Sequence, residues 1–186
     1  MVVILVILVI LSAYFSATET AFTSLNRIRL KSKADAGNRR AALALRLVDQ
    51  YDNLLSTILV GNNIVNLSAS SLATIFFTEG LKLQNGAVIS TAVITIVVLI
   101  FGEVSPKSLA KEYPESFAMF SAPIMRVLMI ILTPVNILFG LLKRLLSLVF
   151  HKEGDGGITE EELVTMVDQA ESEGGLDQHE SKLIRS

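Results

Sequence analysis

The sequence contains no cysteine and no tryptophan, and only two histidines among its 186 residues. The lack of cysteine excludes disulfides, thiolate zinc sites and thiol nucleophiles. His151 and His179 lie close to the C-terminus, so a histidine-built metal site in the long apolar runs that precede them is excluded as well. A metal site within those runs must use oxygen ligands, which favour hard cations.

Charged residues are also few, and they are unevenly placed. They make up 18% of the chain, against 51% hydrophobic residues, and the net charge of −2 combines a basic stretch early in the sequence with an acidic stretch near its end. This composition is typical of an integral membrane protein with one compact membrane domain, not of a soluble globular protein.

Three segments have the length and the freedom from charge that a membrane crossing requires. Residues 1–18, 53–78 and 83–102 carry no charged side chain, and a spanning helix needs about 20 residues at a rise of about 1.5 Å each. We therefore predict an all-α integral membrane fold with three transmembrane helices, near residues 2–25, 53–78 and 87–110.

The charges that flank these segments predict an orientation. The second connection, residues 79–86, contains Lys82 as its one cation, whereas the first is strongly basic. The cations of the first connection are Arg27, Arg29, Lys31, Lys33, Arg39, Arg40 and Arg46. The positive-inside rule then places the N-terminus outside and the C-terminus in the cytoplasm, in a plasma or inner membrane. Beside a membrane helix these cations favour anionic lipid of the bilayer, and no nucleic-acid partner is expected.

Two segments leave alternatives open. The first apolar run could instead be a secretory signal, because Ala13 and Ala17 are small, although it has no basic n-region. Residues 112–152 are apolar but are divided by three prolines and by Arg126. A fourth crossing would place cations outside, so we favour membrane-embedded juxtamembrane helices that return to the cytoplasm over a fourth span.

A change in composition near residue 150 sets the predicted domain boundary. Glycines at 154, 156 and 157 form a joint, and Thr159 with Glu162 has the spacing of a helix capping box. We expect a transmembrane ion-binding domain over residues 1–150 and a cytoplasmic acidic helical tail over residues 151–186. Because the helical pattern stops in mid-course at Ser186, we expect the tail to lead to a further domain.

Polar side chains recur at helical spacing within the first two predicted spans. The first carries Ser12, Ser16, Glu19 and Thr23, and the second carries Asn62, Asn66, Ser70 and Thr74. Each set is spaced by three or four residues and therefore occupies one helical face. Polar groups at bilayer depth must face a protein interior, a cavity or an ion. Because both stripes pass mid-span depth, we expect them to meet at one level.

The third span adds a backbone oxygen to this set. Pro106 has no N–H, so the carbonyl of Gly102 loses its helical partner, and Glu103 lies beside it. Hydroxyl, amide and carbonyl oxygens suit a hard cation such as Mg²⁺, Na⁺ or Ca²⁺, with Glu19 and Glu103 as nearby compensating charge. Gly102 and Pro106 could also form a hinge, because a broken helix rearranges more easily than an intact one.

Each polar residue also has a purely structural interpretation. Serine and threonine in membrane helices often bond their own i−4 carbonyl, and asparagine can link two helices. Glu19 can extend toward the basic inner surface, and Glu103 can pair with Lys107 one turn later.

Three segments together carry a family resemblance. They are SAYFSATETAFTSLNRIRL, the run from Leu59 through Gly61, Asn62 and Asn66 to IVNLSAS, and FGEVSPKSLA. In combination, over residues 4 to about 150, they resemble the transmembrane domain of the CorC/CNNM magnesium transport proteins. The acidic helices that follow also fit this family.

The resemblance implies a homodimer of three-span subunits that exports Mg²⁺ with Na⁺ as coupling ion. It implies that the side chains of Ser12, Ser16, Asn66 and Ser70 bind Mg²⁺ together with the Gly102 carbonyl. Asn62 and Glu103 match other motif positions and would support the site. The family normally continues into a pair of CBS domains that binds ATP, which is missing from this sequence.

We therefore expect magnesium transport through a dehydrated site between the helices. The alternative is a membrane-anchored Mg²⁺ sensor that regulates other transporters without carrying ions. An enzyme is not expected, since the sequence has no HExxH or GxSxG motif and no histidine in the spans to pair with a serine.

Overall fold

The computed structural model describes residues 1–138 and 140–141, which belong to one compact unit, Met1–Leu141. The described residues form helices and turns and contain no strand, which confirms the predicted all-α class. The predicted acidic tail, residues 151–186, lies outside the described residues.

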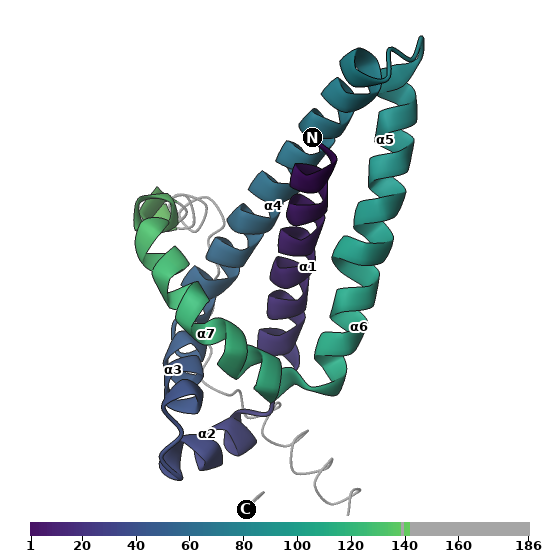
Figure 1. The fold of residues 1–186 in the computed structure, drawn as a ribbon. Helices are drawn as coiled ribbons and strands as arrows, with labels where there is room; N and C mark the ends of the chain where they lie inside the picture. The colour runs from purple at the N-terminus through teal and green to yellow at the C-terminus, as the bar shows by residue number, and fades with distance from the viewer. Residues whose placement is uncertain (139, 142–186) are drawn as a thin grey trace, which may run out of the picture. The chain divides into compact units, whose positions relative to one another are not determined.

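Three long helices run alongside one another (Figure 1). Helix α1 (Val2–Ser24) is antiparallel to α4 (Tyr51–Ile75), which continues as the π-helical segment η1 (Phe76–Gly80). Helix α5 (Gly86–Val97), the π-helical segment η2 (Val98–Val104) and α6 (Ser105–Glu112) join into one continuous helix that runs parallel to α1. These are the three spans predicted from charge-free length, and their boundaries agree within two residues.

The basic first connection folds as two short helices, α2 (Arg27–Asp35) and α3 (Arg39–Val48). Each begins at an asparagine N-cap, Asn26 or Asn38, whose side chain accepts hydrogen bonds from backbone N–H groups of the first turn. Gly37, with a φ of 91°, makes the turn between them. Helix α3 then buries Ala44 and Leu47 against the rest of the unit.

Helix α7 (Pro114–Ile131) is the fourth helix that is long and apolar enough to cross a membrane. Both of its ends nevertheless lie near the same end of the bundle. In its first turn, Glu115 accepts a hydrogen bond at 3.4 Å from the N–H of Asn26, which directly follows α1. Beyond its last turn, Asn136 Nδ2 donates at 3.1 Å to Thr57 Oγ1, in the second turn of α4. This arrangement favours the predicted juxtamembrane helix over a fourth span.

The apolar core is divided into two clusters. The larger joins the second half of α1 to α2, α3, α7 and the start of α4, around side chains such as Leu30, Leu54 and Met125. The smaller lies toward the other end of the long helices, around Ala69 and Ile94. The layer between the two clusters is where α1, α4 and η2 bring polar groups together.

Candidate ion-binding site

Ser12, Asn62 and Gly102 define one polar level between the three long helices. Ser12 Oγ donates a hydrogen bond to Asn62 Oδ1 at 3.4 Å, which joins α1 to α4. Segment η2 approaches from the other side so closely that a Cβ added to Gly102 would lie 2.9 Å from Ser12 Oγ. Ser12 is fully buried, and only a residue without a side chain fits opposite it.

Two further predicted ligands carry buried oxygens that lack hydrogen-bond partners. These are Ser16 Oγ and Asn66 Oδ1, and within the described part of the chain nothing donates to or accepts from them. Leaving a buried polar group without a partner costs about 1–3 kcal/mol. Native proteins rarely retain that cost without a reason, which is often an unseen water or ion. An unseen water or ion beside each atom would supply the missing partner.

Ser16 and Asn66 lie on opposite sides of the Ser12 level. Because α1 and α4 are antiparallel, a step of four residues moves about 6 Å along the two helices in opposite directions. The Cα–Cβ bond of a helical residue tilts toward the helix N-terminus. The same tilt applies to Ser12 and Asn62, so Ser16 and Asn66 remain about one turn to either side of their level. The two polar stripes were expected to meet at one level, and the hydrogen bond between Ser12 and Asn62 joins them at one level.

A cavity of about 220 Å³ opens between α4 and the α5–η2 helix. Its polar lining consists of Asn66, Ser70, Thr95 and Glu103. Since a water molecule takes about 30 Å³ of liquid volume, the cavity has room for several waters or for a partly hydrated ion. Thr95 was not predicted, although its i, i+8 spacing to Glu103 was a visible signal.

The ends of the two stripes behave as the structural interpretation predicts. Thr23 Oγ1 donates to the carbonyl of Glu19, and Thr74 Oγ1 donates to the carbonyl of Ser70, each at 3.0 Å. Each threonine hydroxyl thus donates its proton to a carbonyl of its own helix, so neither threonine is a candidate ligand. Ser16 makes no such bond, so the i−4 interpretation fails at the middle of the stripe.

Glu19, not Glu103, is the partner of Lys107 in the structure. Glu19 forms an ion pair with Lys107 of α6 at 3.2 Å, which ties α1 to the third long helix. Glu103, the expected i−4 partner of Lys107, lines the cavity instead. A carboxylate of η2 thus lines the same cavity as Asn66.

The predicted break at Pro106 takes a different form in the structure. The helix is not interrupted; it widens into the π-helical η2, and Pro106 lies in the first turn of α6 directly after it. A π-helical turn absorbs the hydrogen-bond mismatch that a proline creates, and such turns are frequent at functional sites. Gly102, at the closest approach to α1, belongs to this segment.

The site is poor in charge. Among residues 1–138 and 140–141, no group of three or more Asp, Glu, His and Cys side chains is placed to hold a metal ion. The oxygens present are those of hydroxyls, amides and a backbone carbonyl, with Glu103 as the nearby carboxylate. Such a set binds a hard cation weakly enough to release it again.

Comparison with known proteins places this arrangement in a family. Residues 3–180 match the family model described as cyclin M transmembrane N-terminal domain (CNNM). The chain is 40% identical over 169 residues to the UPF0053 inner membrane protein YfjD of Escherichia coli, covering 88% of this chain and 39% of that protein. It is 36% identical over 187 residues to a UPF0053 protein of Haemophilus influenzae, covering 98% of this chain and 44% of that protein.

A plant relative is similar over the same region. A chloroplastic DUF21 domain-containing protein of Arabidopsis thaliana is 31% identical over 192 residues, which cover 98% of this chain and 28% of that protein. The chain thus spans less than half the length of each of these curated relatives.

Proposed function

The chain belongs to the cyclin M (CNNM) transmembrane-domain family, and from this premise we propose that it transports Mg²⁺ across the membrane. The ion would bind between α1, α4 and η2. Its ligands would be the side chains of Ser12, Ser16, Asn66 and Ser70 and the carbonyl of Gly102. Asn62 and Glu103 would support this set from the same layer.

The observation that carries the proposal is the pair of unpartnered buried oxygens, Ser16 Oγ and Asn66 Oδ1. They lie one turn to either side of the level where Ser12, Asn62 and Gly102 converge. A purely structural polar layer would be expected to satisfy its own hydrogen bonds, as Thr23 and Thr74 do. Oxygens held in place without partners instead suit a ligand that arrives and leaves.

The chemistry of the ligands favours transport over tight storage. Mg²⁺ dehydrates reluctantly and wants octahedral oxygen contacts at about 2.0–2.1 Å. Neutral ligands with little compensating charge bind it less strongly than a carboxylate cage would. The π-helical η2 supplies the element that would rearrange during a transport cycle, since it carries both Gly102 and Glu103.

The remaining expectations belong to the same proposal. Export toward the side of the N-terminus, with Na⁺ as the coupling ion, would follow from the predicted orientation, in which the basic α2 and α3 face the cytoplasm. The functional unit would be a homodimer. In the longer protein, the region after residue 186 would contribute the CBS pair that responds to nucleotide.

Mg²⁺ flux in proteoliposomes that contain only this purified chain tests the proposal. We expect Mg²⁺ movement down its gradient that depends on the protein and is lost in Asn66→Ala. Asn63→Ala is the matched control, because Asn63 lies on the same helix but is exposed. Mg²⁺ binding without flux in any gradient would favour the sensor instead, and the absence of both would contradict the proposal.

A further inference from the structure

Arg126 is the one charged residue of α7 after its first turn. It is exposed on a helix whose composition otherwise suits the membrane, and no carboxylate lies within ion-pair distance of it in the described part of the chain. An arginine at membrane depth is costly unless an anion or water meets it. An anionic partner for it would therefore come from outside the described residues.

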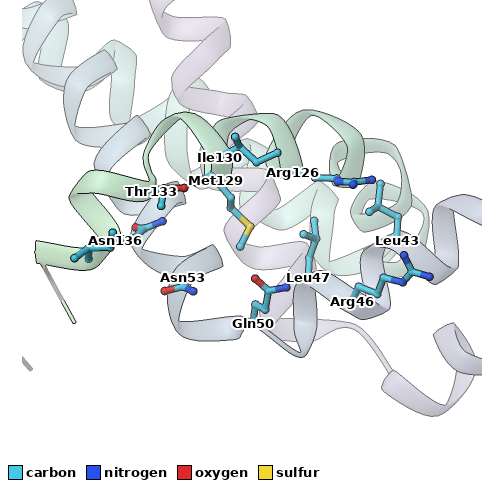
Figure 2. A pocket seen from close by; sticks show the side chains of 11 residues that line it. Leu43, Arg46, Leu47, Gln50, Asn53, Arg126, Met129, Ile130, Thr133 and Asn136 are labelled. Atoms are coloured by element: carbon cyan, nitrogen blue, oxygen red, sulfur yellow. Dashed lines mark hydrogen bonds between the residues drawn. The ribbon is translucent and has the colours of Figure 1, made fainter. Parts of the chain in front are cut away.

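A pocket of about 580 Å³ supplies a place for such a partner. It lies between α3, the start of α4 and α7, and Arg126 and Arg46 are both among its lining residues (Figure 2). The two guanidinium groups lie at one end of the pocket. Arg46 also forms no ion pair with any described carboxylate, and no acidic residue lines the pocket. Two arginines without an acid favour a phosphate, which guanidinium groups bind in bidentate fashion.

The opposite end of the pocket offers a hydrogen-bond acceptor. Asn136 Oδ1 is buried there without a partner. Its amide orientation is fixed, because Asn136 Nδ2 donates to Thr57 Oγ1, whose own proton goes to the carbonyl of Asn53 at 2.8 Å. A ligand that reaches this oxygen would present a hydroxyl or ammonium donor at some distance from its anionic group.

The pocket wall is half apolar, and its apolar part continues onto the outer face of α7. Leu47, Met129 and Ile130 line the pocket, and Ile130 and Ile131 are exposed at 65% and 63% of their surface. Free phosphate esters have nothing to place against such a wall, whereas acyl chains do. The pocket also adjoins the basic first connection, where an anionic membrane surface is expected.

We propose that this pocket binds the headgroup of an anionic phospholipid. The phosphodiester contacts Arg46 and Arg126, a headgroup hydroxyl donates to Asn136 Oδ1, and the acyl chains leave over Ile130 and Ile131. The bound lipid thereby contacts both α3 and α7 and links these juxtamembrane helices. This inference does not depend on the proposed transport of Mg²⁺.

Native mass spectrometry of the purified chain tests this site with three probes. They are dioctanoyl phosphatidylglycerol, dioctanoyl phosphatidylcholine, which lacks a headgroup donor, and water-soluble glycerol phosphate. Because one charge-assisted contact is lost, we expect the Kd for phosphatidylglycerol to rise about tenfold or more in Arg126→Gln and in Arg46→Gln. Arg39→Gln removes the same charge from an exposed position of α3 outside the pocket and is expected to bind like the parent chain.

Each outcome decides the assignment. Equal binding of phosphatidylglycerol to all variants, or no binding to the parent chain, overturns it. Phosphatidylcholine binding as tightly as phosphatidylglycerol removes the role of Asn136 and of the net charge, and also overturns it. Glycerol phosphate binding as tightly as the short lipid assigns the pocket to a soluble phosphate ester instead. Arg126→Lys retains the charge but not the bidentate geometry, and an intermediate Kd in this variant separates loss of the contact from loss of the fold.

Discussion

Ser12 and Asn62 are joined by a hydrogen bond of 3.4 Å at the level where Gly102 closes against the same serine hydroxyl. The bond fixes the register of the antiparallel α1 and α4. With that register set, Ser16 and Asn66 lie one turn to either side of this level. The polar layer of the membrane domain is thus organised by one contact between two neutral side chains.

Substitution of Gly102 by alanine should disturb this layer directly. The added methyl group would lie 2.9 Å from Ser12 Oγ and 3.3 Å from Val98 Cγ1. Overpacking of this kind costs about 1–3 kcal/mol of stability, and it would also push η2 away from the proposed ligands on α1. We expect a lower thermal midpoint in detergent together with weaker Mg²⁺ binding. Gly140→Ala is the matched control, because an added Cβ there meets nothing within 4 Å.

The double variant Ser12→Ala with Gly102→Ala separates steric crowding from other effects. Removing the serine hydroxyl relieves the closest contact of the new methyl group. The stability cost of the double variant should therefore be smaller than the sum of the two single costs. Strict additivity would show that crowding against Ser12 is not the cause of the stability lost in Gly102→Ala.

We expect Glu115 to contribute more to the stability of the juxtamembrane helices than the other carboxylates around it do. Its side chain is buried, lies 3.6 Å from Arg29 Nη1 and accepts a hydrogen bond from the N–H of Asn26. Glu115→Gln removes the charge that both donors face and should lower the free energy of unfolding by about 1–2 kcal/mol. Glu112→Gln, at an exposed position two residues before α7, should change it by less than about 0.5 kcal/mol. Thermal unfolding of both variants makes the comparison, and equal effects would contradict the assignment.

The ion pair between Glu19 and Lys107 should contribute little to stability. Both side chains are 42% exposed, so water competes with the contact. A double-mutant cycle with Glu19→Gln and Lys107→Gln should give a coupling energy of about 0.2–1 kcal/mol. Raising the ionic strength should reduce it further. A coupling that is much larger, or insensitive to salt, would mean that the pair is shielded from water in the assembled protein.

Sequence patterns predicted the parts of this fold that depend on one segment at a time. Charge-free length gave the three long helices within two residues, because each needs only enough apolar residues to span a bilayer. Helical spacing placed Ser12 with Ser16 and Asn62 with Asn66 on single faces. Prolines and Arg126 in the fourth apolar segment indicated a helix that does not cross, which agrees with the contacts at both ends of α7.

Features that depend on how two helices pack could not be obtained in this way. Stripe spacing predicted that the two stripes meet at one level, but it does not state the register, so the pairing of Ser12 with Asn62 could not be predicted. The i−4 rule gave Lys107 the wrong partner, because a tertiary neighbour, Glu19, lies closer. Pro106 predicted a broken helix, whereas packing against α1 is compatible with a π-helical widening that begins at Val98. The basic pocket joins α3 to α7 across about 80 residues of sequence, beyond the reach of any local pattern.

Mg²⁺-dependent thermal stability of the purified chain tests the central claim most directly, with Ca²⁺ and Na⁺ as comparison ions. A ligand that binds only the folded state stabilises it by about 2.7 kcal/mol at a hundredfold excess over its Kd. We predict a Mg²⁺-induced rise in the thermal midpoint that is lost in Asn66→Ala and retained in Asn63→Ala. The same rise in all three proteins, or none in the parent chain, would contradict an intramembrane Mg²⁺ site at Asn66.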